Sequence, residues 1–504
     1  MISIRTIPRS QIAACFSLLL LVGLPHSRCC ALALSSPIQT QPAKKTARGK
    51  DRTIPALMVS DIHFDPFRDP GKVRQLVNAP VTEWGSILSS PPSPSQPQAF
   101  AELQQTCHER GVDTPYPLLG SSLMAMRSQL ANAKFVTLSG DLIAHGFTCR
   151  YSTLFPASSP AEYRKFVLKT IRFVLGRLRA SFPGVPIYVA LGNNDSACGD
   201  YRLDGESDFL ALTGSIIARG LPPSDRQHVI HEFSRDGSYS VMMAAPMRNT
   251  RLIVLDDVFL SSEYSTCSHK QRSSAADVEM TWLRNQLSQA RRLGQKVWVM
   301  GHIPTGIDPY STMKYRDVCA HQSPVTFLSS PKLAGLLIEY ADVIRLGIFA
   351  HTHMDEIRLL KPEGNPDVPS KRMVAIKMVA SISPVDGNDP SFTIARINPR
   401  TAMLENYTVI AASNQTGIAT TWSKEYDFRL TYHQTQFTPA TLQALVKEFA
   451  ADPGANNEAS RSYLRYYFIG DRSPELKPYW PEYVCALSNY NANDYAACAC
   501  SKNK

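Results

Sequence analysis

Ligand-type side chains follow short apolar runs at five places in this chain. They comprise carboxylates, imidazoles and one side-chain amide, and at two of the five places two such residues are separated by a single position. These groups are borderline-to-hard ligands that suit zinc, manganese or iron(II). The set therefore predicts a metal centre, and its members are Asp61, His63, Asp141, Asn193, His302, His351 and His353.

The two pairs, Asp61-x-His63 and His351-x-His353, carry more weight than the single residues. On an extended backbone, side chains two positions apart project to the same side. The histidine pair alone could lie in a surface hairpin, and a lone histidine such as His302 would more often be structural. Recurrence of the pattern at five ordered strand ends favours a metal centre over these structural interpretations.

Runs of apolar and β-branched residues predict the strands that would position this set. The expected strands cover 54–60, 135–139, 186–191, 251–255, 296–300 and 343–349, and a strand-like alternation continues over 356–397. Helices are expected over 117–133, after the cap-plus-proline pair Ser159-Pro160, over 275–293 and near 331–341. Residues 66–100 are rich in proline and serine and predict a long surface loop.

Alternating strands and helices predict an α/β fold of mixed sheets flanked by helices. In such sheets, ligands bind at the carboxyl ends of the strands, which is where the whole predicted metal centre lies. From about residue 425 the chain is rich in Tyr, Gln and Ala at helical spacing, so a helical C-terminal subdomain is expected. The resulting division is a signal peptide over 1–33, a linker over 34–52, a catalytic domain over 53–424 and a helical, disulfide-containing subdomain over 425–504.

The overall composition is that of a globular protein, with 44% hydrophobic and 19% charged residues. A formal net charge of +10 could attract phosphate-bearing substrates or anionic surfaces, although a surplus of surface Lys and Arg is its plainer explanation. The sequence contains no dense basic run with interleaved aromatic residues, so nucleic-acid binding is not predicted. We expect a monomer that acts on a small phosphate-containing substrate.

The N-terminus has the layout of a secretory signal peptide. Arg5 and Arg9 precede an apolar run over 16–24, and Ala31-Leu32-Ala33 offers a small-residue cleavage site. The run is short for a membrane span, and a signal anchor is the alternative. No later run is long and apolar enough to cross a bilayer, which leaves peripheral lipid contact open.

Eight of the eleven cysteines follow the predicted cleavage site, which is consistent with four disulfides in an oxidising compartment. Cys149 and Cys198 lie just after two of the ligand positions, where disulfides that pin the site loops are expected. The sequence alone leaves the connectivity open. A secreted, periplasmic or lumenal location follows, and two glycosylation sequons begin at Asn406 and Asn414.

The five motifs together resemble the ordered motifs of the calcineurin-like metallophosphoesterase superfamily. They are Asp61-x-His63, Gly140-Asp141, Gly192-Asn193, Gly301-His302 and His351-x-His353. Further segments are similar to the acid sphingomyelinase-like phosphodiesterases: Gly140-Asp141-x-x-Ala144-His145, Phe349-Ala350-His351-Thr352-His353-x-Asp355-Glu356, Ser383-Pro384, Asn388-Asp389-Pro390-Ser391-Phe392, Tyr483-Val484-Cys485-Ala486 and Cys498-x-Cys500. The resemblance spans roughly 54–500.

The resemblance implies a β-sandwich of the metallophosphoesterase type and two divalent metal ions, with zinc expected first and manganese or iron as alternatives. Asp141 would bridge the ions. Asp61, His63 and His353 would complete one site, and Asn193, His302 and His351 the other. A shared hydroxide would attack the phosphorus. The resemblance also suggests that His145 protonates the leaving group or stabilises the phosphoryl charge, and that Cys267 pairs with Cys319 and Cys485 with Cys498.

One departure from the family pattern concerns Asn194, which stands where the family often has a second active-site histidine. An amide can donate a hydrogen bond to a phosphate oxygen but cannot protonate a leaving group near neutral pH. Protonation would then fall on His145, or the substrate would need a good leaving group such as a phosphate. The run Gly192-Asn193-Asn194-Asp195 also resembles, more loosely, the endopolyphosphatase branch of the superfamily.

A second departure is the lack of room in residues 34–53 for the saposin-like domain that helps acid sphingomyelinase extract lipid. Soluble phosphodiesters, nucleotides or polyphosphate are therefore the expected substrates. The enzymatic alternative is a sphingomyelin phosphodiesterase that releases phosphocholine. The non-enzymatic alternative is a metal-binding surface protein with a degraded site, which Asn194 suggests and the complete set of ligands argues against.

Overall fold

The computed structural model describes residues 53–271, 274–364, 368–470 and 472–501. The predicted signal peptide (1–33) and the predicted linker (34–52) lie outside these ranges, as do Cys15, Cys29 and Cys30. Residues 51–504 form one compact unit by their internal contacts. No helix in the described ranges combines the length and apolar character that a membrane crossing requires.

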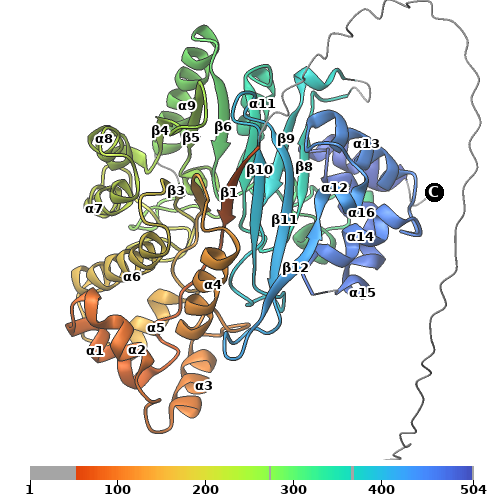
Figure 1. Cartoon of the computed structure of the whole chain (residues 1–504). Helices are drawn as coiled ribbons and strands as arrows, with labels where there is room; N and C mark the ends of the chain where they lie inside the picture. Colours follow the sequence, from red (N-terminus) through yellow and green to blue (C-terminus); the bar gives the residue numbers. More distant parts are fainter. Residues whose placement is uncertain (1–52, 272–273, 365–367, 471, 502–504) are drawn as a thin grey trace, which may run out of the picture. The chain divides into compact units, whose positions relative to one another are not determined.

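Two six-stranded mixed sheets form the centre of the molecule (Figure 1). The first has the order β12-β11-β10-β1-β2-β3 and the second the order β4-β5-β6-β7-β9-β8. Strands of the first sheet are β1 (Ile54–Val59), β2 (Val136–Ser139), β3 (Ile187–Ala190), β10 (Ser391–Ile397), β11 (Leu404–Ala412) and β12 (Trp422–Asp427). Strands of the second are β4 (Tyr239–Met242), β5 (Thr250–Val254), β6 (Lys296–Met300), β7 (Ile344–Phe349), β8 (Ile357–Leu360) and β9 (Val374–Met378).

Each sheet contains a parallel block. β1, β2 and β3 run parallel to one another, and so do β5, β6, β7 and β9. β1, β2 and β3 are buried along their whole length, because the parallel part of a sheet is covered on both faces. The predicted α/β sandwich of mixed sheets is confirmed.

Large aromatic side chains join the two sheets. Tyr239 of β4 accepts a hydrogen bond from the Val189 amide of β3 at 2.9 Å and donates one to the Val189 carbonyl at 3.1 Å. Phe135, just before β2, meets the buried Trp298 of β6 edge to face, with ring centroids 5.7 Å apart. These contacts hold the two sheets, and with them the ends of their parallel strands, against each other.

The helices before the C-terminal part are α1 (Val73–Asn78), α2 (Trp84–Ser89), α3 (Gln96–Thr106), α4 (Tyr116–Gln129), α5 (Phe147–Leu154), α6 (Pro160–Ser181), α7 (Asp208–Ile217), α8 (Arg226–Asp236), α9 (Ala275–Arg292), α10 (Pro309–Tyr315) and α11 (Lys332–Glu339). The predicted start of α6 is confirmed by a capping box, in which Ser159 and Glu162 satisfy each other's backbone amides. Helices α7 and α8 and strand β4 were not predicted from the sequence.

The prediction of a long surface loop over 66–100 is wrong, because α1, α2 and the start of α3 occupy this segment. The reason is a buried anchor within the polar sequence. Trp84 is fully buried, and its indole N–H donates to the Leu76 carbonyl at 3.0 Å. Lys169 of α6 donates to three carbonyls at the end of α1, including that of Leu76 at 2.9 Å.

The C-terminal part is helical, as predicted. It consists of α12 (Phe428–Tyr432), α13 (Pro439–Ala450), α14 (Glu458–Tyr467), α15 (Ser473–Leu476), α16 (Trp480–Ala486) and α17 (Ala492–Ser501). α13 contacts β8 and β9, and α12 contacts β11 and β12. In Figure 1 these helices are blue and lie beside β8 and β12. Strand β12 spans the position between residues 424 and 425 at which we placed the subdomain boundary.

Candidate metal centre and active site

The seven predicted ligands all follow the carboxyl ends of parallel strands. Asp61 and His63 come after β1, Asp141 after β2, Asn193 after β3, His302 after β6, and His351 and His353 after β7. Backbone hydrogen bonds continue the sheets into these loops: the Asp61 amide donates to the Gly140 carbonyl at 3.1 Å, and the Ala350 amide to the His302 carbonyl at 2.8 Å. The fold therefore brings the two parallel blocks together at one polar centre.

The backbone in these loops is not extended, contrary to the assumption made for the two spaced pairs. Asp61 and His63 have φ values of 44° and 42°, and His351 and His353 have values of 75° and 64°. A left-handed conformation in a residue other than glycine is uncommon, and it is found preferentially at functional sites. Asp141 has the same conformation, with φ of 55°. The chain thus turns sharply at each strand end so that both side chains of a pair face the centre.

One group of ligand atoms surrounds His63. Its Nε2 lies 3.1 Å from His353 Nε2, 3.3 Å from Asp141 Oδ2 and 3.8 Å from Asp61 Oδ1. His353 Nε2 lies 3.5 Å from Asp61 Oδ1. The ligand atoms of Asp61, His63 and Asp141 all lie within 4.8 Å of one another, which is close enough for one metal ion to contact all three.

A second group surrounds Asn193. Its Oδ1 lies 3.0 Å from His302 Nε2 and 3.0 Å from His351 Nδ1. His302 Nε2 is 3.3 Å from Asp141 Oδ2. The Asn193 amide nitrogen donates to Asp200 at 2.7 Å, which turns the amide oxygen toward the two imidazoles.

Asp141 is shared by the two groups. Its Oδ2 lies 3.3 Å from an imidazole nitrogen on each side, that of His63 and that of His302. Two glycines allow this approach: Gly140 adopts φ of 92°, and a Cβ on Gly192 would collide with Oδ1 of Asp141. The carboxylate is buried, with 1% exposure, so its charge is not screened by solvent.

Two observations indicate that these side chains are suited to bind metal ions. Both carboxylate oxygens of Asp61 are buried and have no hydrogen-bond partner among the described residues. An unpaired buried carboxylate is costly unless a cation neutralises it. In addition, the Nε2 atoms of His63 and His353 face each other at 3.1 Å, so one metal ion could contact both imidazoles.

The pKa values of the imidazoles suit this role. Burial lowers the pKa of His63 to about 4 and that of His353 to about 3, so both rings are neutral near pH 7, the form that binds a metal. Burial alone would raise the pKa of Asp141, but His302 and His63 hold it well below its usual range. Against the effect of burial, Asp141 in turn raises the pKa of His302 to about 10, so cation binding at His302 would release a proton.

His145 lies against this centre. Its ring stacks on that of His63, with centroids 3.9 Å apart and an angle of 19° between the planes. Its side chain is 32% exposed, whereas that of His63 is fully buried. The placement, with one ring face on a ligand and part of the ring open to solvent, would let His145 reach a substrate held at the centre.

Asp113 orients His145, and this role could not be predicted because Asp113 follows no predicted strand. Asp113 accepts from the His145 backbone amide at 2.8 Å and contacts His145 Nδ1 at 3.0 Å. It also accepts from the Ser383 hydroxyl at 2.9 Å. Burial would lower the pKa of His145, but the Asp113 carboxylate raises it to about 9.

Asn194 faces Asp141. Its backbone amide donates to Asp141 Oδ1 and its side-chain amide to Asp141 Oδ2, both at 2.9 Å. The side chain is therefore engaged with the shared carboxylate. It lies at the centre, as the motif predicted, but its donor is aimed at a protein acceptor.

Two further buried aspartates hold the site loops. Asp195 accepts from the amides of Leu142 and Gly192, at 2.8 and 3.0 Å. Asp257 accepts from the amides of His302 and Ile303, both at 2.9 Å. Asp195 stood beside the predicted ligands in the sequence, whereas Asp257, three positions after the end of strand β5, was missed.

The disulfides correct one predicted pairing. Cys485 pairs with Cys498, as predicted, but Cys267 pairs with Cys198 and not with Cys319. The reason is local pairing of their segments: Ser265 exchanges backbone hydrogen bonds with Tyr201 and Leu203, which brings Cys267 beside Cys198. Cys319 pairs instead with Cys500 of α17.

The remaining pair, Cys107 and Cys149, joins α5 to the residue that follows α3. Disulfides at Cys149 and Cys198, just after site loops, were predicted and are present.

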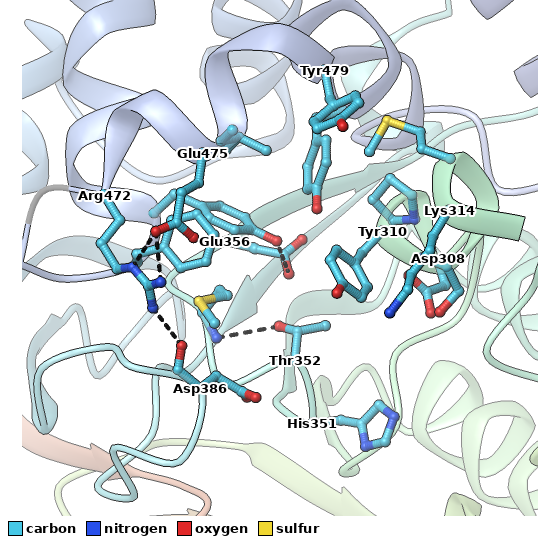
Figure 2. A pocket seen from close by; sticks show the side chains of 18 of the residues that line it. Asp308, Tyr310, Lys314, His351, Thr352, Glu356, Asp386, Arg472, Glu475 and Tyr479 are labelled. Carbon is cyan, nitrogen blue, oxygen red and sulfur yellow. Dashed lines mark hydrogen bonds and ion pairs between the residues drawn. The ribbon is translucent and has the colours of Figure 1, made fainter. Parts of the chain in front are cut away.

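A cavity of about 780 Å³ opens beside His351. Figure 2 shows Tyr310 and Lys314 on one side of it and Arg472 and Glu475 on the other, with His351 at its lower edge. Its walls come from α10, the loop after β7 and the C-terminal helices. The metal centre is therefore continuous with a space large enough for a small organic substrate.

Known proteins match this chain in sequence. The calcineurin-like phosphoesterase family model matches residues 54–355. The mouse protein named cyclic GMP-AMP phosphodiesterase SMPDL3A is 24% identical over 454 residues, covering 87% of this chain and 90% of the mouse protein. Sphingomyelinase phosphodiesterase D of Dictyostelium discoideum is 25% identical over 324 residues, covering 63% of this chain and 65% of its own.

Among solved structures, a dimetal phosphatase from Danio rerio aligns with a TM-score of 0.39 at 10% identity, over 74% of this chain and 99% of that one. The matched family region contains the strand ends after β1, β2, β3, β6 and β7, and so all seven ligand positions. The chain therefore belongs to the calcineurin-like phosphoesterase superfamily and, within it, to the acid sphingomyelinase-like phosphodiesterases, and it is a metal-dependent phosphoric ester hydrolase.

Proposed function

We propose that this protein is an exported hydrolase that cleaves phosphodiester or phosphoanhydride bonds of soluble substrates with two divalent metal ions, zinc being the first candidate. The observation that carries the proposal is the position of Asp141 Oδ2, 3.3 Å from an imidazole nitrogen of each ligand group. Manganese and iron remain alternatives because the ligand types suit all three metals.

The proposed ligands divide between the two ions. Asp61, His63 and His353 would hold one, Asn193, His302 and His351 would hold the other, and Asp141 would be shared between them. The ions would supply an activated water and neutralise the phosphoryl charge. The protein contributes the geometry, since the ligands come from the ends of five strands in two packed sheets.

His145 is the proposed general acid. Hydrolysis forms a bond between phosphorus and the oxygen of water and breaks the bond to the leaving oxygen, which must then take up a proton unless it is a weak base. Asp113 holds His145 in its protonated form, as its raised pKa of about 9 indicates. Asn194 cannot protonate a leaving group near neutral pH, so its proposed role is to orient Asp141 through the 2.9 Å hydrogen bond that its side-chain amide donates to Oδ2.

The substrate class is the less constrained part of the proposal. A relative in mouse is named for cyclic GMP-AMP, and this favours nucleotides. A relative in Dictyostelium is named as a sphingomyelinase, and this favours the second candidate, release of phosphocholine from sphingomyelin. Export is supported by four disulfides among the described residues, because such bonds persist in oxidising compartments.

A substrate panel tests the proposal. It contains a nucleoside triphosphate, polyphosphate, an aryl phosphodiester and sphingomyelin in detergent, each assayed with the wild type and Asp141→Asn. We expect turnover of the soluble substrates and a loss of at least about a thousandfold in kcat/KM for Asp141→Asn, as for other groups that stabilise transition-state charge. Full activity of Asp141→Asn would contradict the proposed mechanism. Turnover of sphingomyelin alone would establish the second candidate.

A further inference from the structure

The four imidazoles of the metal centre each have a second ring nitrogen that does not face the other ligands. In three of them this nitrogen faces an uncharged group: His63 Nδ1 the Ile143 carbonyl at 3.0 Å, His302 Nδ1 the Ser139 carbonyl at 2.7 Å, and His351 Nε2 the Tyr201 hydroxyl at 3.2 Å. His353 differs, because its Nδ1 lies 3.2 Å from Oδ2 of a carboxylate, that of Asp386. This nitrogen is buried and forms no hydrogen bond within the described ranges, so Asp386 is the acceptor within its reach.

Asp386 lies in the loop that joins β9 to β10, and this loop is bound to the ligand loops after β1 and β7. The Ser381 amide donates to the His353 carbonyl at 3.1 Å, and the Ser383 amide donates to the Asp61 carbonyl at 3.0 Å. His353 and Asp61 are proposed ligands of the same ion. The loop that carries Asp386 is therefore fixed to two ligands of one ion.

Arg472 precedes α15 and binds the main chain of Asp386. Its Nη1 donates to the Asp386 carbonyl at 2.6 Å, and its Nε donates to Glu475 Oε1 at 2.7 Å. Figure 2 shows Arg472 between these two acidic residues. Gly387 permits the approach, because it adopts φ of 82° and a Cβ on it would collide with Arg472 Nη1. The backbone at Asp386 is thus tied to the C-terminal helices, while its carboxylate, which is 52% exposed, is free to rotate toward His353.

A carboxylate beside the outer nitrogen of a metal-binding imidazole has a definite effect on the ligand. It keeps the proton on that nitrogen, which leaves the lone pair of the other nitrogen for the ion, and it makes the imidazole a stronger donor. In His353 the other nitrogen is Nε2, which faces His63 Nε2 at 3.1 Å. The lone pair would therefore be directed into the ligand group that surrounds His63.

Building on the two-metal function proposed above, we infer that Asp386 is a positioning residue for the metal ligand His353 and that Arg472 holds Asp386 in place. Asp386 orients the imidazole and strengthens its bond to the ion that Asp61 and His63 also bind. The C-terminal helices thereby contribute to the affinity of one of the two metal sites, although they supply none of the seven proposed ligands.

Zinc titration of the metal-free protein tests the inference. The purified protein is stripped of metal and refilled with zinc in competition with a chromophoric chelator, and its fold is checked by circular dichroism. For Asp386→Asn we expect one of the two ions to bind about 10- to 100-fold more weakly, the usual cost of losing such a partner, with the other ion unaffected. Asp386→Glu retains the carboxylate and should bind the affected ion more tightly than Asp386→Asn does.

Arg472→Met tests the second half of the inference. This variant keeps the Asp386 carboxylate but releases its main chain, so we expect weaker binding of the same ion. In the Asp386→Asn background, Arg472→Met should cause no further loss, because the two residues act in series. Fully additive losses would show that Arg472 does not act through Asp386 and would overturn this half.

Asp308→Asn is the matched control for the loss of charge. Asp308 lines the same cavity, and within the described ranges it forms no hydrogen bond or ion pair with the seven ligands. Asparagine is also a good helix cap, so α10 should persist and both zinc affinities should match those of the wild type. Unchanged zinc affinities in Asp386→Asn, or an equal loss in Asp308→Asn, would overturn the inference and leave the phosphoesterase function intact. A wild type that binds no zinc and hydrolyses no phosphate substrate would instead refute the underlying function.

Discussion

At the scale of single residues, Asp141 organises the centre because, in the part of the chain that the structure describes, it is the one carboxylate within 3.3 Å of an imidazole nitrogen in both groups. The neighbouring ligands adopt left-handed backbone conformations, with φ between 42° and 75° at Asp61, His63, His351 and His353. Such conformations persist only where the surroundings enforce them. Here the surroundings are the ends of parallel strands and the aspartates Asp195 and Asp257, which bind the loop amides.

Replacing Asp113 should change the pH dependence of kcat/KM. The His145 pKa is raised to about 9, so the proposed acid is protonated below that pH and loses its proton as the pH rises through that value. Asp113→Asn removes the negative charge, and burial then lowers the pKa of His145. We expect the alkaline limb of kcat/KM to move down by about 1–2 pH units. The measurement is a pH profile with a phosphodiester whose leaving group is a poor one.

Two comparisons give this experiment its control. Ser383→Ala removes a hydroxyl donor from Asp113 without changing its charge, and its profile should match wild type within a few tenths of a unit. A nitrophenyl ester needs little protonation, so its kcat should fall far less in Asp113→Asn. An alkaline limb that stays in place would show that His145 is not the acid.

At the scale of secondary structure, the strand ends were predictable because two local signals coincide there. A short apolar run marks each strand, and ligand residues follow it, as after β2 at Asp141 and after β6 at His302. The prediction failed where a local signal misleads. The proline- and serine-rich segment before α3 is helical because Trp84 anchors it in the core.

Contacts between residues far apart in the chain could not be predicted from the sequence. Asp113 contacts His145 across 32 residues, and Cys319 meets Cys500 across 181. Contacts between residues so far apart produce no repeating pattern of residue types from which they could be predicted. The left-handed φ values at the ligand pairs were missed for a related reason, since tertiary packing and not residue type imposes them.

Two of the disulfides should differ in how much they stabilise the protein against unfolding. Cys319–Cys500 closes 181 residues and ties α17 to the segment after α10, whereas Cys485–Cys498 closes only 13. The chain-entropy relation gives losses of about 5 and about 3 kcal/mol in the free energy of unfolding on removal. We expect Cys319→Ser/Cys500→Ser to have the lower urea midpoint and Tm of the two double variants. The reverse order would mean that strain or local contacts outweigh loop closure.

At the scale of the whole molecule, two packed sheets bring five strand ends to one point, and the C-terminal helices complete the cavity next to it. The loops at the strand ends thus carry the proposed metal ligands, while α10 and the helices after β12 line the cavity beside them.

The proposed mechanism requires two metal ions that share Asp141, so the metal content of the purified protein is the decisive measurement. Elemental analysis by mass spectrometry should find about two divalent ions per chain in the wild type. In Asp141→Asn, with its fold checked by circular dichroism, it should find about one or fewer, because removal of the shared carboxylate weakens both sites. A wild type that turns over an aryl phosphodiester at full rate with well under two ions per chain, or an Asp141→Asn variant that retains both ions, would contradict the account.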